Sequence, residues 1–178
     1  MRAFAGGEVV ASQDPNFQAG DWVTGLLGAQ SHAIVKGDQL TKVSSELGPL
    51  SWHLGILGMP GMTAYFGLLE RGQPKEGETI LISGAAGIVG STVGQIARIK
   101  GCKVIGTAGT QAKCRYLVEE CGFTAAINYR EEDVASKLKE YAPNGLDIYY
   151  DNVGGPMLDT ALANLARGAR VVICGAIS

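Results

Sequence analysis

The sequence predicts an α/β fold: a doubly wound parallel sheet preceded by part of a small β-rich domain. From Gly58 onward, short apolar runs typical of buried strands alternate with helical patterns, which indicates parallel strands joined by right-handed crossovers. Before residue 58 there are only short β-like runs, separated by Gly, Asp, Asn and Pro. The expected domains are therefore residues 1–57 and residues 58–178.

The first domain has few candidate strands and no hairpin signature between them. The expected strands are Glu8–Ser12, Trp22–Leu27, Ala33–Lys36 and Leu40–Val43. Because so few strands rarely close a β domain, residues 1–57 are interpreted as part of one.

The second domain alternates strand and helix throughout. The first strand is entirely apolar at its centre, as expected for a strand buried on both faces of a parallel sheet. The expected strands are Thr79–Ser83, Lys103–Thr107, Ala125–Tyr129, Leu146–Asp151 and Arg170–Cys174. The expected helices are Met62–Glu70, Gly87–Lys100, Gln111–Cys121, Glu131–Tyr141 and Met157–Ala166. Sheets of this class usually continue into a sixth strand, so the domain is predicted to be C-terminally incomplete.

Composition narrows the classes of partner. Hydrophobic residues make up 46% and charged residues 18% of the 178 residues, which is enough apolar material for a core. The net charge of −2 gives no reason to expect nucleic acid or a membrane surface as a partner. No apolar run reaches membrane-spanning length and the first residues lack a signal-peptide pattern, so a cytoplasmic protein is expected.

The cysteines and histidines do not form a metal motif. No CxxC pair occurs, and free thiols in a reducing compartment are a better interpretation than a metal site or a disulfide. The residues concerned are Cys102, Cys114, Cys121, Cys174, His32 and His53.

A glycine-rich turn follows the first strand of the second domain. In Ser83–Gly90, Ala85 takes the first position of a G-x-G-x-x-G pattern, and Gly87 and Gly90 take the second and third. Gly87 would let the backbone approach a pyrophosphate, and Gly90 would let the following helix pack closely. Such a turn can also merely connect a strand to a helix. Because a predicted strand precedes it and a predicted helix follows it, the pattern favours a dinucleotide-binding Rossmann domain.

The end of the second strand indicates which dinucleotide is bound. NAD sites place an acidic residue there, but no Asp or Glu occurs from Ser91 to Val118. The strand is followed instead by Gly109-Thr110 and then Lys113, which suits a 2′-phosphate and favours NADP(H) over NAD. The alternative is that Lys113 is an ordinary solvated helix residue.

Two further loops follow strands at the same predicted edge of the sheet. Asp151–Gly155 follows the fourth strand and Cys174–Ser178 follows the fifth. Ligands of such sheets bind along the carboxyl ends of the strands. The alternative is that Gly154-Gly155 is only a turn and Asn152 a local cap.

Four segments together resemble one known family: Gly58–Tyr65, Gly84–Gly90, Asp151–Gly155 and Cys174–Ser178. With these segments the chain resembles the zinc-independent branch of the medium-chain dehydrogenase/reductase superfamily. It is most similar to the NADP-dependent alkenal double-bond reductases, which include prostaglandin reductases, leukotriene B4 dehydrogenases and bacterial curcumin reductases. The resemblance runs almost from end to end.

The resemblance implies a set of cofactor-binding residues and leaves the acid and base unassigned. The set is Gly87, Ile88, Val89, Gly90, Lys113, Tyr129, Asn152, Cys174, Gly175, Ala176, Ile177 and Ser178. The first four would wrap the pyrophosphate, Lys113 and Tyr129 would contact the 2′-phosphorylated adenosine, and Asn152 would lie along the cofactor. The last five would begin the loop that passes the nicotinamide.

The resemblance also implies an activity. Members of the group use NADPH to reduce the C=C bond of α,β-unsaturated ketones and aldehydes, with hydride delivered to the β-carbon. It implies a small-molecule substrate, a homodimer formed through edge strands, and a GroES-like substrate-binding domain of which residues 1–57 would be a part. The alternatives are a quinone reductase of the same superfamily and a non-catalytic NADP-binding module.

Overall fold

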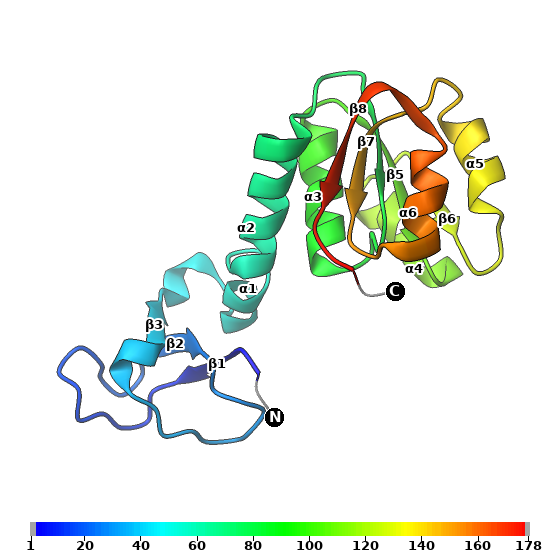
Figure 1. The fold of residues 1–178 in the computed structure, drawn as a ribbon. Helices are drawn as coiled ribbons and strands as arrows, with labels where there is room; N and C mark the ends of the chain where they lie inside the picture. Colours follow the sequence, from blue (N-terminus) through cyan, green and yellow to red (C-terminus); the bar gives the residue numbers. More distant parts are fainter. Residues whose placement is uncertain (1–2, 177–178) are drawn as a thin grey trace. The chain divides into compact units, whose positions relative to one another are not determined.

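The computed structural model describes residues 3–176. The chain divides into two compact units, and the boundary along the sequence lies between Pro60 and Gly61. The smaller unit contains an antiparallel sheet in the order β1-β2-β3 (Figure 1). Its strands are β1 (Ala5–Glu8), β2 (Trp22–Gly25) and β3 (Leu40–Val43). Its short helices are η1 (Gly37–Gln39), η2 (Ser45–Leu47) and α1 (Leu50–Leu54).

The smaller unit confirms some of the expected strands and corrects others. The strand Leu40–Val43 has the predicted bounds, and β2 begins at Trp22 as predicted. The strand expected at Glu8–Ser12 lies instead at Ala5–Glu8, because these residues pair with β2 from Ala5↔Gly25 to Glu8↔Trp22. The strand expected at Ala33–Lys36 is wrong: Ile34 is fully exposed and no strand pairs with this segment.

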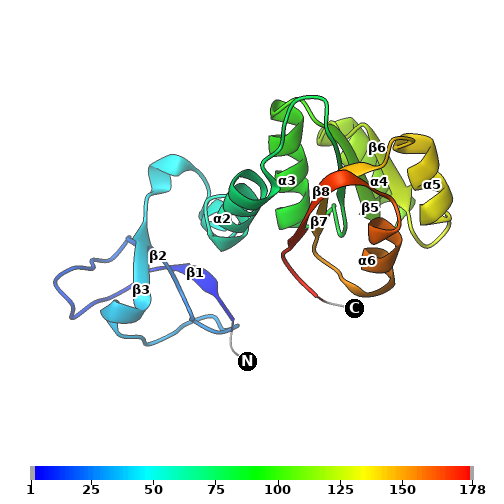
Figure 2. The same cartoon turned by 45° about the horizontal axis from the view of Figure 1, so that its top comes forward.

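The larger unit contains a parallel sheet in the order β6-β5-β4-β7-β8. Four of these strands, β5, β6, β7 and β8, are labelled in Figure 2. Its strands are β4 (Thr79–Ile82), β5 (Lys103–Ala108), β6 (Ala125–Asn128), β7 (Leu146–Asp151) and β8 (Leu165–Ile173). The chain runs outward from β4 to β6 on one side and from β7 to β8 on the other. This order, with its reversal beside β4, confirms the predicted doubly wound Rossmann fold.

Helices cover both faces of this sheet (Figure 1). They are α2 (Met59–Phe66), η3 (Gly67–Gly72), α3 (Ile88–Ile99), α4 (Gln111–Arg115), η4 (Tyr116–Glu120), α5 (Val134–Tyr141) and α6 (Gly155–Leu162). In β4, Ile80 and Ile82 join the core cluster that includes Val93 of α3, whereas Leu81 joins the cluster that includes Leu138 of α5. The central strand is therefore buried on both faces, as its apolar sequence predicted.

Helix boundaries differ from the predicted ones for local reasons. The helix expected at Glu131–Tyr141 begins at Val134, because the Asp133 carboxylate caps it by accepting the Ser136 N–H at 2.9 Å. The helices expected at Met62–Glu70 and Gln111–Cys121 both change to π-helical turns in their second halves. Sequence periodicity does not distinguish such turns from α-helix.

The last helix and strand are also displaced from their predicted bounds. The helix expected at Met157–Ala166 is Gly155–Leu162, and the strand expected at Arg170–Cys174 is Leu165–Ile173. Strand pairing decides this boundary, because Leu165 pairs with Leu146 of β7. The chain must therefore leave the helix before that residue.

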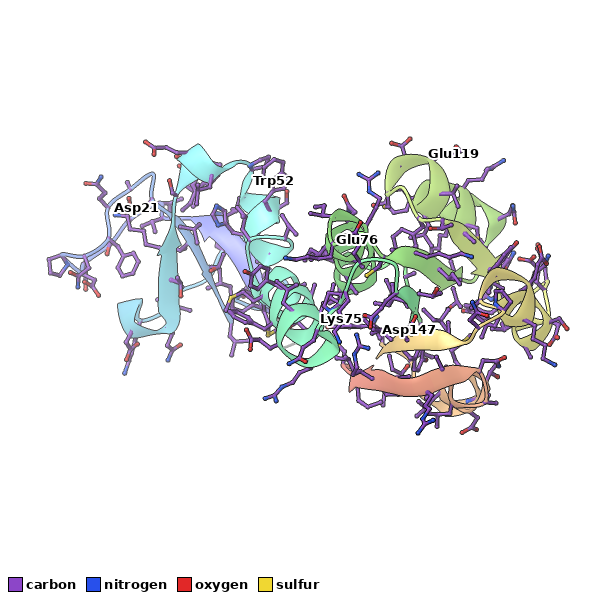
Figure 3. All side chains as sticks on the ribbon, turned by 90° about the horizontal axis from the view of Figure 1, so that it is seen from above. Asp21, Trp52, Lys75, Glu76, Glu119 and Asp147 are labelled. Carbon is purple, nitrogen blue, oxygen red and sulfur yellow. The ribbon has the colours of Figure 1, made fainter. Side chains whose placement is uncertain are left out.

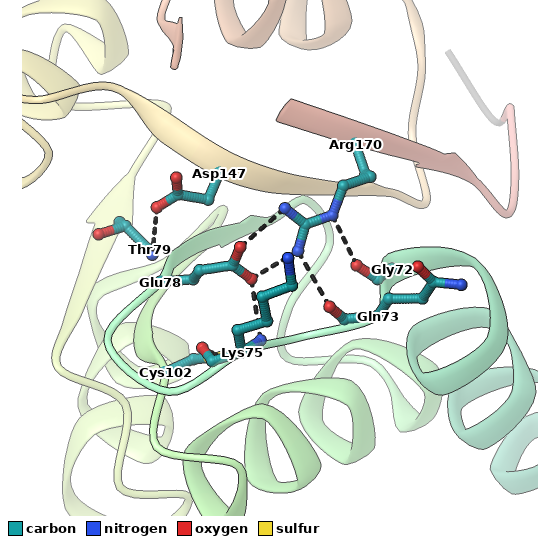
Figure 4. Close-up of polar contacts among 8 residues, drawn as sticks. All are labelled: Gly72, Gln73, Lys75, Glu78, Thr79, Cys102, Asp147 and Arg170. Atoms are coloured by element: carbon teal, nitrogen blue, oxygen red, sulfur yellow. Dashed lines mark hydrogen bonds and ion pairs between the residues drawn. The ribbon is translucent and has the colours of Figure 1, made fainter. Parts of the chain in front are cut away.

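A polar cluster ties the amino ends of the central strands to the preceding helix (Figure 4). The Arg170 guanidinium donates to both carboxylate oxygens of Glu78, at 2.8 Å and 2.5 Å. It also donates to the carbonyl oxygens of Gly72 and Gln73, at 2.9 Å and 3.1 Å. Beside it, Asp147 (labelled in Figure 3) accepts the Thr79 N–H at 2.8 Å. The edge strand β8 is thus anchored to the end of η3.

Within residues 3–176, no helix is both long and apolar enough to cross a membrane.

Candidate dinucleotide site

The glycine-rich turn links β4 to α3 at the carboxyl end of the sheet. Gly84 adopts a φ of 57°, in the left-handed region that favours glycine. Ala85 follows outside that region, and its N–H donates to the Thr107 carbonyl at 3.0 Å. The left-handed position therefore precedes Ala85. This explains why alanine is tolerated at the first position of the glycine pattern.

Gly87 and Gly90 differ in how much space a side chain would have at each position. A Cβ on Gly90 would lie 2.7 Å from the Ala85 Cα and 2.8 Å from the Gly84 carbonyl oxygen. Close packing of α3 on the turn therefore requires glycine at residue 90. A Cβ on Gly87 would meet only the Gly84 oxygen, at 3.4 Å, and Gly87 has an ordinary φ of −78°. Nothing in the protein itself requires glycine at this exposed position.

The amino end of α3 presents unpaired backbone donors. The first N–H groups of a helix lack intrahelical partners, and Gly87 at the N-cap has no side chain that could accept from them. The helix has 12 residues, so its dipole adds a partial positive charge at this end. Ile88 is exposed, Val89 half-buried and Gly90 buried. The turn and the first helical residues together form a surface that favours an anion such as a phosphate.

The predicted adenosine-side residues follow the second and third strands of the larger unit, β5 and β6. Tyr129 N–H donates to the Ala108 carbonyl at 3.1 Å, which continues the pairing of β6 with β5. Its hydroxyl lies 2.8 Å from where a Cβ on Gly109 would be, so the Tyr129 side chain lies over Gly109. Lys113 is exposed in the first turn of α4, and Thr110 caps that helix by accepting the Lys113 N–H at 3.3 Å.

A buried carboxylate organises the ends of β4 and β7. Asp151 Oδ1 accepts from the Ser83 hydroxyl at 2.9 Å and the Tyr149 hydroxyl at 2.7 Å. It also accepts the backbone N–H groups of Val153 at 3.0 Å and Gly154 at 2.9 Å. Asp151 Oδ2 is buried and has no hydrogen-bond partner among the described residues. One oxygen of this side chain thus holds both the strand end and the loop that follows it.

These contacts determine the ionisation of the carboxyl group and of its neighbour. Burial alone would raise the pKa of Asp151, but the hydrogen bonds from Gly154 N–H, the Tyr149 hydroxyl, Val153 N–H and Ser83 outweigh it and lower the pKa. Asp151 is therefore a carboxylate at neutral pH. Burial, assisted by the negative charge of Asp151, raises the pKa of Tyr149 far above its usual value, so this phenol stays protonated and donates its hydrogen bond to Asp151.

The loops after β7 and β8 come together beside Asp151 and Ser83. Asn152 donates its backbone N–H to Ser83 Oγ at 2.9 Å and its side-chain amide to the Ser83 carbonyl at 2.8 Å. The N–H groups of Cys174 and Gly175 donate to the Asp151 carbonyl at 2.8 Å and 3.0 Å. Asn152 is therefore tied to the glycine turn and is more than a cap of its own loop.

The structure brings most of the predicted cofactor residues to the carboxyl edge of the sheet. Cys174 is half-buried and Ala176 exposed, whereas Ile177 and Ser178 lie outside the described residues. The Lys113 ammonium has no hydrogen bond or ion pair with another described residue. Sequence reasoning missed the organising roles of Ser83 and Asp151. The sequence did contain a pattern that could have predicted these roles, because each of the two is a polar residue at the end of a largely apolar strand.

The strand order, the glycine turn and the open amino end of α3 define a class: a Rossmann domain of the dinucleotide-binding type. Residues 89–178 match the family model described as zinc-binding dehydrogenase, and residues 1–43 match one described as the N-terminal domain of oxidoreductase. The first match covers half of the chain, so the chain belongs to the zinc-binding dehydrogenase family.

Named relatives refine this assignment. The chain is 49% identical over 170 residues to the NADPH-dependent curcumin reductase of Escherichia coli (strain K12), a match that covers 96% of this chain and 49% of that protein. It is 48% identical over 173 residues to the 2-alkenal reductase (NADP(+)-dependent) of Nicotiana tabacum, with 96% and 50% covered. These relatives confirm the predicted resemblance to the alkenal reductase group.

A solved structure agrees with these matches. CurA from Vibrio vulnificus in complex with NADPH superimposes with a TM-score of 0.86 at 42% identity, covering 94% of this chain and 50% of that chain. The chain spans about half the length of the curated relatives that it matches.

The family description names zinc, but the described residues do not fit a zinc site. Residues 3–176 contain no group of three or more His, Cys, Asp or Glu side chains that could hold a metal ion. His53 is buried with Nε2 at 2.9 Å from the Ser44 carbonyl oxygen, and His32 is exposed. Cys102, Cys114 and Cys121 are buried free thiols, and Cys174 is a half-buried free thiol.

Proposed function

We propose that this chain binds NADP(H) along the carboxyl edge of its parallel sheet and serves an NADPH-dependent reductase of α,β-unsaturated ketones and aldehydes. Bound NADPH would supply the hydride, which is delivered to the β-carbon of the C=C bond. The names of the matched relatives, a curcumin reductase and a 2-alkenal reductase, support this substrate class. The NADPH complex of the matched CurA structure supports the cofactor.

The observation that carries the cofactor assignment is the open space at Gly87. Its dihedral angles would suit any residue, and a Cβ there would meet only one atom, at 3.4 Å. A glycine that the protein itself does not require, at the amino end of a helix with unpaired N–H groups, is well suited to close approach by a pyrophosphate.

The other residues of the edge would hold and orient the cofactor. Gly87, Ile88, Val89 and Gly90 would bind the pyrophosphate through backbone N–H groups, and Lys113 and Tyr129 would contact the 2′-phosphate. Asn152 and the loop that begins with Cys174, Gly175 and Ala176 would pass the nicotinamide. Asp151 would act as a positioning residue, because it orders the Asn152 loop through Val153 and Gly154.

The smaller unit has a separate proposed role. Residues 1–57 would belong to a substrate-binding domain, as the match of residues 1–43 to the N-terminal domain of oxidoreductases suggests. The proposal further includes a cytoplasmic location and a homodimer. The exposed edge of β8, where Ile173 is 62% exposed, is a candidate for pairing with a second copy. Sedimentation equilibrium of the purified chain would show whether it is a dimer.

The test of the central proposal is a titration of the purified chain with NADPH and with NADH, followed by intrinsic fluorescence. An enal, a cyclic enone and a quinone are then added separately, and NADPH oxidation is followed by absorbance. We expect selective binding of NADPH, followed by its oxidation with the enal and the enone. Oxidation with the quinone alone would assign the chain to the quinone reductases instead.

Two other outcomes would change the proposal. Selective NADPH binding without oxidation by any acceptor would leave the cofactor assignment intact and make this chain a cofactor-binding module. Equal affinity for NADH, or no binding of either nucleotide, would contradict the NADP(H) assignment itself.

A further inference from the structure

Two side chains from the end of β6 lie over Gly109, at the end of β5. A Cβ built on Gly109 would lie 2.8 Å from the Tyr129 hydroxyl and 3.3 Å from Arg130 Nε. In NAD-binding domains, the end of this strand supplies the acidic residue that binds the ribose hydroxyls. Here a phenol and a guanidinium occupy the space beside a glycine.

The turn that carries Arg130 is held in place by its neighbours. The Asn128 carbonyl accepts the N–H groups of Glu131 and Glu132, at 3.0 Å and 2.9 Å. Asn128 Oδ1 accepts the Arg130 N–H at 3.3 Å, and the Glu132 carboxylate accepts the Asn128 N–H at 2.7 Å. Because Asn128 is buried, these bonds fix the backbone of residue 130 independently of its side chain.

The Arg130 side chain has no partner of opposite charge among the described residues. Arg130 is exposed, and its guanidinium forms no ion pair or hydrogen bond with another described residue. By contrast, Arg170 donates to both carboxylate oxygens of Glu78. In addition, Asn128 Nδ2 is a buried donor without a partner among the described residues, at the same strand end. An unpaired guanidinium beside a phenol offers hydrogen-bond donors and a positive charge, which a phosphomonoester accepts.

We propose that Arg130 is a specificity-determining residue: with Tyr129, it binds the 2′-phosphate of the adenosine ribose and makes the chain prefer 2′-phosphorylated nucleotides. The inference rests on the proposed NADP(H) function. It makes Arg130 a second cationic residue, beside Lys113, that would contact the 2′-phosphate. A guanidinium donates two parallel hydrogen bonds to a phosphate, whereas the Lys113 ammonium is a point charge. Glycine at residue 109 lets both side chains lie against the end of β5, because a Cβ there would meet Tyr129 and Arg130.

The test measures binding of two small nucleotides by calorimetry, so that it does not depend on turnover. The probes are 2′,5′-ADP and 5′-AMP, which differ only in the 2′-phosphate, and the specificity is the ratio of their dissociation constants. The variants are Arg130→Gln and Arg130→Lys. Arg71→Gln is the matched control, because Arg71 is also exposed but lies in η3, before the amino end of β4. Thermal melts by circular dichroism verify that each variant is folded.

We expect Arg130→Gln to lower the preference for 2′,5′-ADP by about tenfold or more, with 5′-AMP binding unchanged. Arg130→Lys should retain part of the preference, and Arg71→Gln all of it. If Arg130→Gln keeps the wild-type ratio within about twofold while the wild type prefers 2′,5′-ADP, the role of Arg130 is refuted and the NADP(H) assignment stands. If the wild type itself shows no preference, both proposals fail.

Discussion

The Ser83 hydroxyl donates a hydrogen bond to the Asp151 carboxylate across 2.9 Å, in a place where both side chains are buried. The two residues are 68 positions apart in the chain but end neighbouring parallel strands. Ser83 Oγ in turn accepts the Asn152 N–H at 2.9 Å. This pair therefore couples the glycine turn after β4 to the loop after β7, the two segments proposed to hold the cofactor.

Removal of the Asp151 carboxylate should destabilise the larger unit. Asp151→Ala would leave the buried donors of Ser83, Tyr149 and Gly154 without their acceptor, and we expect a loss of about 3 kcal/mol or more in the free energy of unfolding. Asp151→Asn keeps one acceptor oxygen and should cost less, about 1–2 kcal/mol. Urea unfolding followed by fluorescence measures both. Equal effects of the two substitutions would mean that acceptor geometry is not what stabilises this loop.

Gly87 and Gly90 should respond differently to alanine. Gly90→Ala would force the α3 backbone away from Ala85, and we expect a loss of about 2 kcal/mol or more in stability. Gly87→Ala should change stability by less than about 1 kcal/mol but weaken NADPH binding by about tenfold. Thermal melts and NADPH titrations separate the two effects. A Gly87→Ala variant with unchanged NADPH affinity would argue against a pyrophosphate at this turn.

Arg170 should stabilise the larger unit through the hydrogen bonds of its planar guanidinium group as well as through its charge. Arg170→Ala removes donors to Glu78, Gly72 and Gln73, and we expect a loss of about 2 kcal/mol because these groups are only partly exposed. Arg170→Lys should recover only part of it, since an ammonium cannot donate in the same fork geometry. Equilibrium unfolding in urea is the measurement. Full recovery by lysine would show that charge alone matters.

Glu78 should make stability depend on acid pH. The hydrogen bonds from Arg170 lower the pKa of Glu78 below its ordinary value of 4.5, despite partial burial. Its stabilising contribution is therefore complete above about pH 4.5 and is lost as the pH falls through the lower, folded-state pKa. Unfolding free energies measured between pH 6 and pH 3 should fall more steeply for the wild type than for Glu78→Gln. Parallel curves would contradict this assignment.

Local sequence patterns predicted the larger unit better than the smaller one. The strand Leu146–Asp151 has its predicted bounds, and five of its six residues are buried in the sheet. Ala33–Lys36 contains two β-branched residues, Ile34 and Val35, but has no partner strand, and the prediction was wrong there. The π-helical turns at Gly67–Gly72 and Tyr116–Glu120 were missed, because their apolar spacing does not differ visibly from that of an α-helix.

By itself, the sequence determined the alternation of strands and helices, the glycine turn and the absence of an acidic residue at the end of the second strand. Each of these depends on residues that are close along the chain. Only the tertiary structure decided that Ser83 meets Asp151 and that Arg130 lies over Gly109. Such contacts depend on strand order and on burial of both sheet faces, which bring together residues that no local pattern connects.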